Sequence, residues 1–142
     1  MKIAYLRGNE DIIGVLKIDK LHIEAPIMEG TSQEVMKTSV GHFSESDYWN
    51  GNVSLASHNS GTSAHYFEKI NTLGINDEIE YITRLGVKKY KVESLNTIES
   101  TDWSMVVKND KQLSNNTITL ITCINGQPDY RLCVRGTEIW KI

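Results

Sequence analysis

The sequence is poor in several features that often decide what a chain of this size does. It contains only two prolines and two cysteines among 142 residues, and it has no long apolar run. Scarce proline argues against disordered linkers, and without a long apolar run no segment is expected to span a membrane as a helix. Basic residues are also in deficit, 15 against 18 acidic ones, so there is no electrostatic footprint for nucleic acid. Met1–Arg7 is too short for a signal peptide before the sequence turns polar.

What the sequence does contain fits a single domain over residues 1–142. Hydrophobic residues make up 39% and charged residues 23%, as in an ordinary globular chain with one core. Alternating or β-branched segments predict strands over 12–18, 21–28, 52–58, 77–83, 87–95, 117–123 and 130–140. Helical segments are predicted over 31–37, 62–74 and 100–103, the first from a capping box of Thr31 and Glu34, with loops at 41–52 and 108–116. This pattern predicts a mainly β protein, either a barrel or a sandwich.

The predicted strand that ends at Cys123 carries the first candidate for a reactive side chain. Thr117–Cys123 is a β-branched run, which suits a buried strand. Gly126 and Pro128 interrupt a ladder, so Cys123 is expected where this strand opens into a loop. The next strand returns as a β-hairpin and brings Arg131 opposite the thiol. A cysteine in this position can react, whereas an inert buried cysteine is the plainer interpretation.

The second cysteine and the loop carboxylates are predicted to have lesser roles. Strand parity places Cys133 on the face of Arg131 but deeper, so we expect a core residue rather than a bridge to Cys123. Without a Cys-x-x-Cys pair or spaced histidines, a zinc site is not expected. Glu45, Asp47 and Asp110 could mark a calcium site, but solvated loop charges explain them more simply, and no cofactor is expected.

Three side chains suited to acyl transfer stand at predicted strand ends: His58, Cys123 and Arg131. A thiolate is a nucleophile, and a nearby imidazolium or guanidinium favours its charged form. Histidine can pass a proton to a leaving amine, and arginine can hold a carbonyl or an oxyanion. The set would suit transpeptidation or proteolysis through a thioester.

The same residues resemble the signature of a known family. Thr119–Cys123 followed by Arg131–Gly136 resembles the Thr-Leu-x-Thr-Cys and downstream Arg motif of the sortases, and His58 stands where that family carries its histidine. The resemblance extends from Gly14 to Ile139. It implies an eight-stranded β-barrel with two or three short helices.

The resemblance also implies roles for individual residues. Cys123 would be the nucleophile, His58 the general acid and base, and Arg131 the group that stabilises the oxyanion or positions the peptide. Thr122 would add a hydrogen bond to the substrate or the oxyanion. The substrate groove would be lined by Leu55, Ala56, Ser57, the 25–28 strand and the loop before Arg131.

The function implied by the resemblance is cleavage of an LPXTG-like sorting signal between Thr and Gly. The acyl group would be held as a thioester and passed to an amino nucleophile of a cell-wall precursor or a pilin. The partners would be surface proteins bearing sorting peptides, and the enzyme would work at the extracellular face of the cell membrane of a Gram-positive bacterium, attached through an N-terminal anchor that precedes residue 1. A catalytically silent peptide-binding barrel and a plain cysteine protease are the alternatives.

Several positions bear on the sortase class. Ser57 stands where many class A members have Gly, and Asn59 resembles class B. The short connection from Cys123 to Arg131 resembles classes B, C and D, but the compact segment before Cys123 lacks the class B insertion, so an A- or D-like enzyme is favoured. The calcium-binding carboxylates of the best-known class A member are not matched, because this chain has Phe43, Ser46 and Asn50 at those places.

Overall fold

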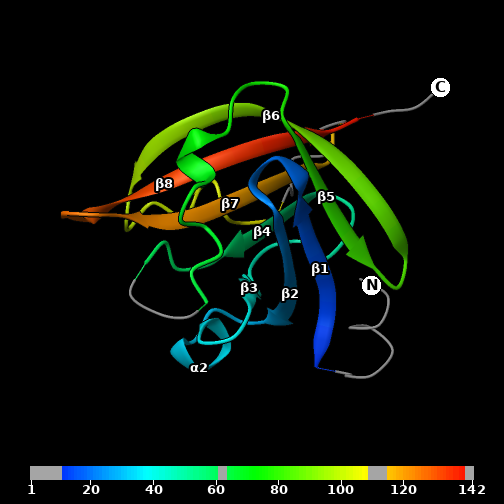
Figure 1. Cartoon of the computed structure of the whole chain (residues 1–142), viewed down its shortest axis with the longest axis horizontal. Helices are drawn as coiled ribbons and strands as arrows, with labels where there is room; N and C mark the ends of the chain where they lie inside the picture. The colour runs from blue at the N-terminus through cyan, green and yellow to red at the C-terminus, as the bar shows by residue number, and fades with distance from the viewer. Residues whose placement is uncertain (1–10, 61–63, 109–114, 140–142) are drawn as a thin grey trace.

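The chain folds into a closed β-barrel (Figure 1). The computed structural model describes residues 11–60, 64–108 and 115–139. The strands within them are β1 Ile12–Ile18, β2 Ile23–Glu29, β3 Val40–His42, β4 Asn52–Ala56, β5 Glu78–Thr83, β6 Gly86–Glu99, β7 Thr117–Ile124 and β8 Gln127–Glu138. Their order around the barrel is β1-β2-β3-β4-β7-β8-β6-β5. The predicted mainly β, eight-stranded barrel is therefore confirmed.

Two parallel pairings interrupt an otherwise antiparallel barrel. β3 runs parallel to β2, and β4 runs parallel to β7. Because parallel strands end at the same side of a sheet, the carboxyl ends of β4 and β7 meet. β7 and β8 form a long hairpin, whose turn contains Gly126 at a φ of 78°, and the hairpin tip extends beyond the rest of the barrel (Figure 1).

The barrel interior holds the main core. Alternate residues of β4 and β7 point into it, so that Val53, Leu55, Ile118 and Leu120 are all fully buried. Opposite them lie Tyr81, Tyr90 and Phe67, the largest buried side chains, and burial raises the pKa of both tyrosines. The intervening residues of β4 and β7 therefore face outward, and that outer face carries the site.

The helices differ most from the sequence-based expectations. The described part of 62–74 contains turns and the 3-10 helix η2, Ile70–Thr72, rather than an α-helix. The apolar spacing there still reports burial, because Phe67, Ile70 and Leu73 pack into the core. The 100–103 segment consists of turns, with Ser104 N–H donating to Asp102 Oδ1 at 3.0 Å.

At 31–37 the structure contains α2, Gln33–Met36, and its N-cap is Ser32, whose hydroxyl accepts from Val35 N–H at 3.2 Å. The expected cap at Thr31 is wrong by one residue. In this register the carboxylate of Glu34 lies in the first turn of the helix rather than closing a capping box.

Strand boundaries also shift. β3 overlaps the start of the predicted 41–52 loop, because a strand of three residues is too short to show a period in the sequence. β2 begins at Ile23 rather than residue 21, because Asp19–Leu21 forms the 3-10 helix η1 and His22 closes it at a φ of 56°. β4 ends at Ala56, before His58. Within the described residues no helix is long and apolar enough to cross a membrane.

Candidate active site

The parallel pairing of β4 with β7 brings His58 level with Cys123. Its last register pair joins Ala56 to Ile121, and Ser57 N–H still donates to Ile121 O at 3.4 Å. His58 follows two residues after Ala56, as Cys123 follows two residues after Ile121. Both side chains therefore lie at the shared carboxyl end of these strands, and both are accessible to solvent.

Arg131 lies directly across the hairpin from Cys123. The two are register partners in the antiparallel β7–β8 pair, where opposite Cβ atoms are about 4.5–5.5 Å apart. The Arg131 Nη1 group donates to the carbonyls of Pro128, at 2.9 Å, and Tyr130, at 2.8 Å. These two bonds hold the guanidinium in place. Because a guanidinium has five N–H donors, others remain for another acceptor.

A β-bulge makes this pairing possible next to a proline. Ile124 pairs with Gln127 and Cys123 with Arg131, so residues 128–130 have no partner on β7. Pro128, which lacks an N–H donor, is tolerated because it lies within that bulge. The carbonyls of the bulge are the ones that hold the Arg131 guanidinium.

An apolar strip leads along the outer face toward the thiol. It comprises Ala56 on β4, Ile121 on β7 and Cys133 on β8, with Phe43 and Val106 packed over it. Cys133 is 1% exposed, and burial raises the pKa of its thiol to about 11. Its side chain is thus a buried apolar group, whereas the Cys123 thiol at the strand end is exposed.

A polar network, which sequence reasoning missed, fastens residues 105–107 over this face. Asn52 is 3% exposed, and its Nδ2 group donates to the carbonyls of Met105 and Val107 at 3.0 Å each. Its Oδ1 accepts from Thr119 Oγ1 at 2.8 Å, and Arg135 donates to both Thr119 and Met105 O. Arg135 therefore caps this turn, as an arginine that alternates with Arg131 along β8 can do without sharing the site.

The predicted groove residues separate onto two faces. Ala56 lies on the outer face with Cys123, whereas Leu55 is fully buried in the barrel core and cannot line an open groove in this structure. Ser57 is 3% exposed. Thr122 is 4% exposed, and its hydroxyl donates its only proton to Ser57 O at 2.8 Å. Of the four, Ala56 is the one that pairs with Ile121 on the outer face that Cys123 shares.

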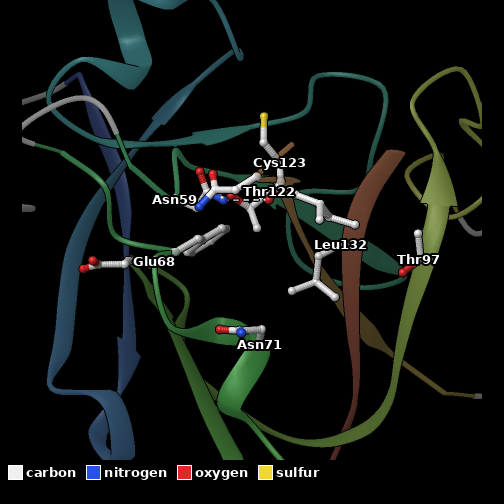
Figure 2. A pocket seen from close by; sticks show the side chains of 10 residues that line it. Asn59, Glu68, Asn71, Thr97, Thr122, Cys123 and Leu132 are labelled. Carbon is white, nitrogen blue, oxygen red and sulfur yellow. Dashed lines mark hydrogen bonds between the residues drawn. The ribbon is translucent and has the colours of Figure 1, made fainter. Parts of the chain in front are cut away.

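A cavity of about 400 Å³ opens on the opposite side of the β7 end (Figure 2). Thr122 and Leu132 project toward it, while the Cys123 sulfur is directed away from it. The cavity also includes Asn59, Glu68 and Asn71. Cys123 itself also borders this cavity, so the cavity reaches the residue that bears the thiol even though the sulfur is directed to the other side.

The carboxylates considered for calcium are used in other ways or fall outside the description. Asp47 Oδ2 accepts from Asn52 N–H at 2.8 Å, and Glu45 is exposed to solvent. Asp110 lies outside the described residues. Across the described ranges, no group of three or more His, Cys, Asp or Glu side chains is arranged to hold a metal ion.

Comparisons with known proteins give one consistent result. A family model described as the sortase domain matches residues 16–139. Sortase D of Bacillus subtilis (strain 168) is 27% identical over 112 residues, covering 78% of this chain and 53% of that protein. The chain thus spans about half the length of this curated relative.

Solved structures show the same fold. Sortase C-1 from Streptococcus pneumoniae superposes with a TM-score of 0.83 at 23% identity, covering 94% of this chain and 70% of that one. Sortase A from Corynebacterium diphtheriae gives a TM-score of 0.82 at 22% identity, covering 99% of this chain and 69% of that one.

Proposed function

Because this chain belongs to the sortase family, we propose that it is a cysteine transpeptidase that cleaves an LPXTG-like sorting signal between Thr and Gly and joins the acyl part to an amine. The observation that carries the proposal is the register: Cys123 lies opposite Arg131 and level with His58. The partners are then sorting peptides of surface proteins and an amino group of the cell wall. The place of action is the outer face of the cell membrane of a Gram-positive bacterium, with an N-terminal membrane attachment, and no cofactor takes part.

The proposed chemistry proceeds in two acyl transfers. The Cys123 thiolate adds to the Thr carbonyl carbon, the bond to the Gly nitrogen breaks, and His58 gives a proton to the departing amine. The resulting thioester is attacked by an incoming amine, which loses a proton to His58, and the carbon–sulfur bond breaks to restore the thiolate. Arg131 donates to the carbonyl oxygen as negative charge develops on it.

Two features bear on specificity and class. The strip of Ala56, Ile121 and Cys133 leads toward the thiol but is buried beneath Phe43 and Val106, so an extended peptide reaches it only when that cover moves. The match to Sortase D supports the D-like side of an A- or D-like assignment. No peptide contact is proposed for Leu55, Ser57 or Thr122, because their side chains are buried.

The test uses fluorogenic LPXTG-like peptides with and without a competing amine. We expect cleavage that Cys123→Ala abolishes, an acyl-enzyme adduct by mass spectrometry, and a product that contains the amine. Arg131→Lys should lower kcat/KM at least about tenfold, because the lysine ammonium cannot reproduce the planar, paired N–H donors of the guanidinium. Arg84→Lys, in the β5–β6 turn, is the matched control.

Other outcomes separate the alternatives. Peptide binding without any thioester would indicate a silent binding barrel, and hydrolysis unaffected by the amine would indicate a plain protease. An unimpaired Arg131→Lys variant would remove Arg131 from the site.

A further inference from the structure

His58 stands beyond the sheet that positions Cys123. The β4–β7 ladder ends at the Ala56–Ile121 pair, and Ser57 and His58 continue in irregular backbone. Residues past the end of a ladder are free to move unless other groups hold them. Something besides β-pairing must therefore keep His58 at a fixed distance from Cys123.

Three hydrogen bonds hold this short segment. The carbonyl before His58, that of Ser57, accepts from Thr122 Oγ1 at 2.8 Å. The His58 carbonyl itself accepts from Phe67 N–H at 3.1 Å. The residue after it, Asn59, donates from Nδ2 to the Cys123 carbonyl at 2.8 Å.

The Asn59 bond is the one that reaches the residue bearing the thiol. It spans from the neighbour of His58 to the carbonyl of Cys123, where the ladder no longer supplies a bond. The same Nδ2 group lies 3.3 Å from Asn125 Oδ1, in the turn that follows Cys123. One amide thus joins the His58 segment to the end of β7 and to the turn of the hairpin.

Resting on the function proposed above, we propose that Asn59 is a positioning residue that sets the spacing and orientation of His58 relative to Cys123. Asn59 lies in the wall of the cavity on the side of β7 away from the sulfur (Figure 2), so it acts through the backbone of Cys123 rather than on the reacting atoms. The reaction rate depends strongly on this spacing, because a misplacement of about 1 Å can lower the rate on the order of 100-fold. Asn59 is half-exposed, and neither this exposure nor its position in the sequence indicates that it positions His58.

The experiment compares Asn59→Ala and Asn59→Asp with Asn71→Ala, which removes an amide from the wall of the same cavity. Asn59→Asp keeps the shape but replaces the Nδ2 donor with an oxygen that faces the Cys123 carbonyl. We expect both Asn59 variants to lower kcat about tenfold with KM little changed, and Asn59→Gln to recover part of the loss. Asn71→Ala should match the wild type.

A second measurement does not depend on turnover. The rate of Cys123 alkylation by iodoacetamide is followed against pH in wild type, His58→Ala and the Asn59 variants. If Asn59 positions His58, its variants should shift the profile toward that of His58→Ala. Arg131 across the hairpin and Glu68 on the cavity wall are charged groups that border this region, and all the variants retain both.

The outcomes distinguish this inference from the proposed function. An unchanged kcat and alkylation profile in Asn59→Ala, with only a lower Tm, would overturn the positioning role. Inactivity of the wild type on every peptide would overturn the transpeptidase, while the alkylation profiles would still decide whether Asn59 couples the two residues. If Asn59→Ala fails to fold, the isosteric Asp variant decides.

Discussion

Cys123 and Cys133 lie on one face of the same hairpin but differ in every property that controls thiol chemistry. Cys123 is exposed at the end of β7, opposite a guanidinium. Cys133 pairs with Ile121 deeper in the sheet, and its pKa is raised to about 11 by burial, against which Arg135 acts weakly in the lowering direction. The two thiols differ in exposure because Cys123 stands at the end of the hairpin and Cys133 lies deeper in the sheet.

Alkylation at about pH 8.5 should therefore give one adduct, on the exposed Cys123. The folded pKa of Cys133 lies above its ordinary value of 9.0, so the stability that this thiol contributes is complete below pH 9.0 and falls as the pH rises toward about 11. Intact-mass spectrometry checks the labelling, and urea unfolding on either side of pH 9.0 checks the stability. Cys133→Val should lose less stability over that interval. Two adducts on the folded protein at the lower pH would contradict both expectations.

Ser57 and Ser54 are a second contrasting pair on the same strand and its continuation. Ser57 Oγ is buried without a hydrogen-bond partner among the described residues, whereas Ser54 Oγ donates to Val106 O at 2.7 Å. Burying an unpaired hydroxyl costs free energy, and removing one partner of a buried bond also costs free energy.

Ser57→Ala should accordingly raise the free energy of unfolding by about 1 kcal/mol, and Ser54→Ala should lower it by about 1–3 kcal/mol. Urea denaturation of the two variants and the wild type measures both changes. A destabilised Ser57→Ala protein would show that its hydroxyl has a partner after all.

At the scale of elements, the turn at residues 105–107 depends on side chains from the sheet beneath it. Its carbonyls are bonded by Asn52, Ser54 and Arg135, and Val106 is 3% exposed over the apolar strip. Because Val106 covers the apolar strip, the order of this turn controls whether the strip is exposed. The sheet thus determines the conformation of a segment that has no regular structure of its own.

Asn52→Ala should detach this turn and lower the free energy of unfolding by about 3 kcal/mol, since several buried partners lose their bonds together. Asn52→Asp should be about as harmful, because it presents an oxygen to the carbonyls of Met105 and Val107. Hydrogen exchange at 104–107 and urea denaturation measure the effect, with the Asn71→Ala variant as control. Unchanged exchange in both Asn52 variants would show that the turn is held by packing alone.

At the scale of the whole molecule, barrel closure depends on the short strand β3. It pairs in parallel with β2 and antiparallel with β4, and so links the first hairpin to the strands that carry the site. Gly41 lies at this seam, where an added Cβ would lie 2.4 Å from the Gly30 carbonyl oxygen. Backbone atoms cannot give way as a flexible side chain can.

Gly41→Ala should therefore separate β3 from its neighbour and cost about 2–3 kcal/mol of the free energy of unfolding. Gly74→Ala is the control, because its nearest contact would be an ordinary 3.7 Å to Asp77 Oδ2. Urea midpoints of both variants are compared with the wild type. Equal midpoints for the two would mean that the seam can widen freely.

The local features of this protein can be predicted from its sequence. The β-branched run predicted β7, Gly126 and Pro128 predicted the break after Cys123, and the hairpin that follows places Arg131 across from the thiol, because each depends on residues close together in the chain. The eight-stranded barrel was expected from the resemblance and is confirmed by the topology.

Features that depend on partners distant in the chain become visible when the barrel is assembled. The parallel β4–β7 register, which places His58 and Cys123 each two residues beyond the last strand pair, joins segments that periodicity cannot align. The same is true of the burial of Leu55 away from the thiol, the turn held by Asn52, and the bond from Asn59 to Cys123. Apolar spacing at Phe67 and Ile70 predicted burial correctly but helix wrongly, because a side chain can reach the core from a turn as well as from a helix. Periodicity reports which face is buried, whereas the partner it is buried against is settled only when the barrel closes.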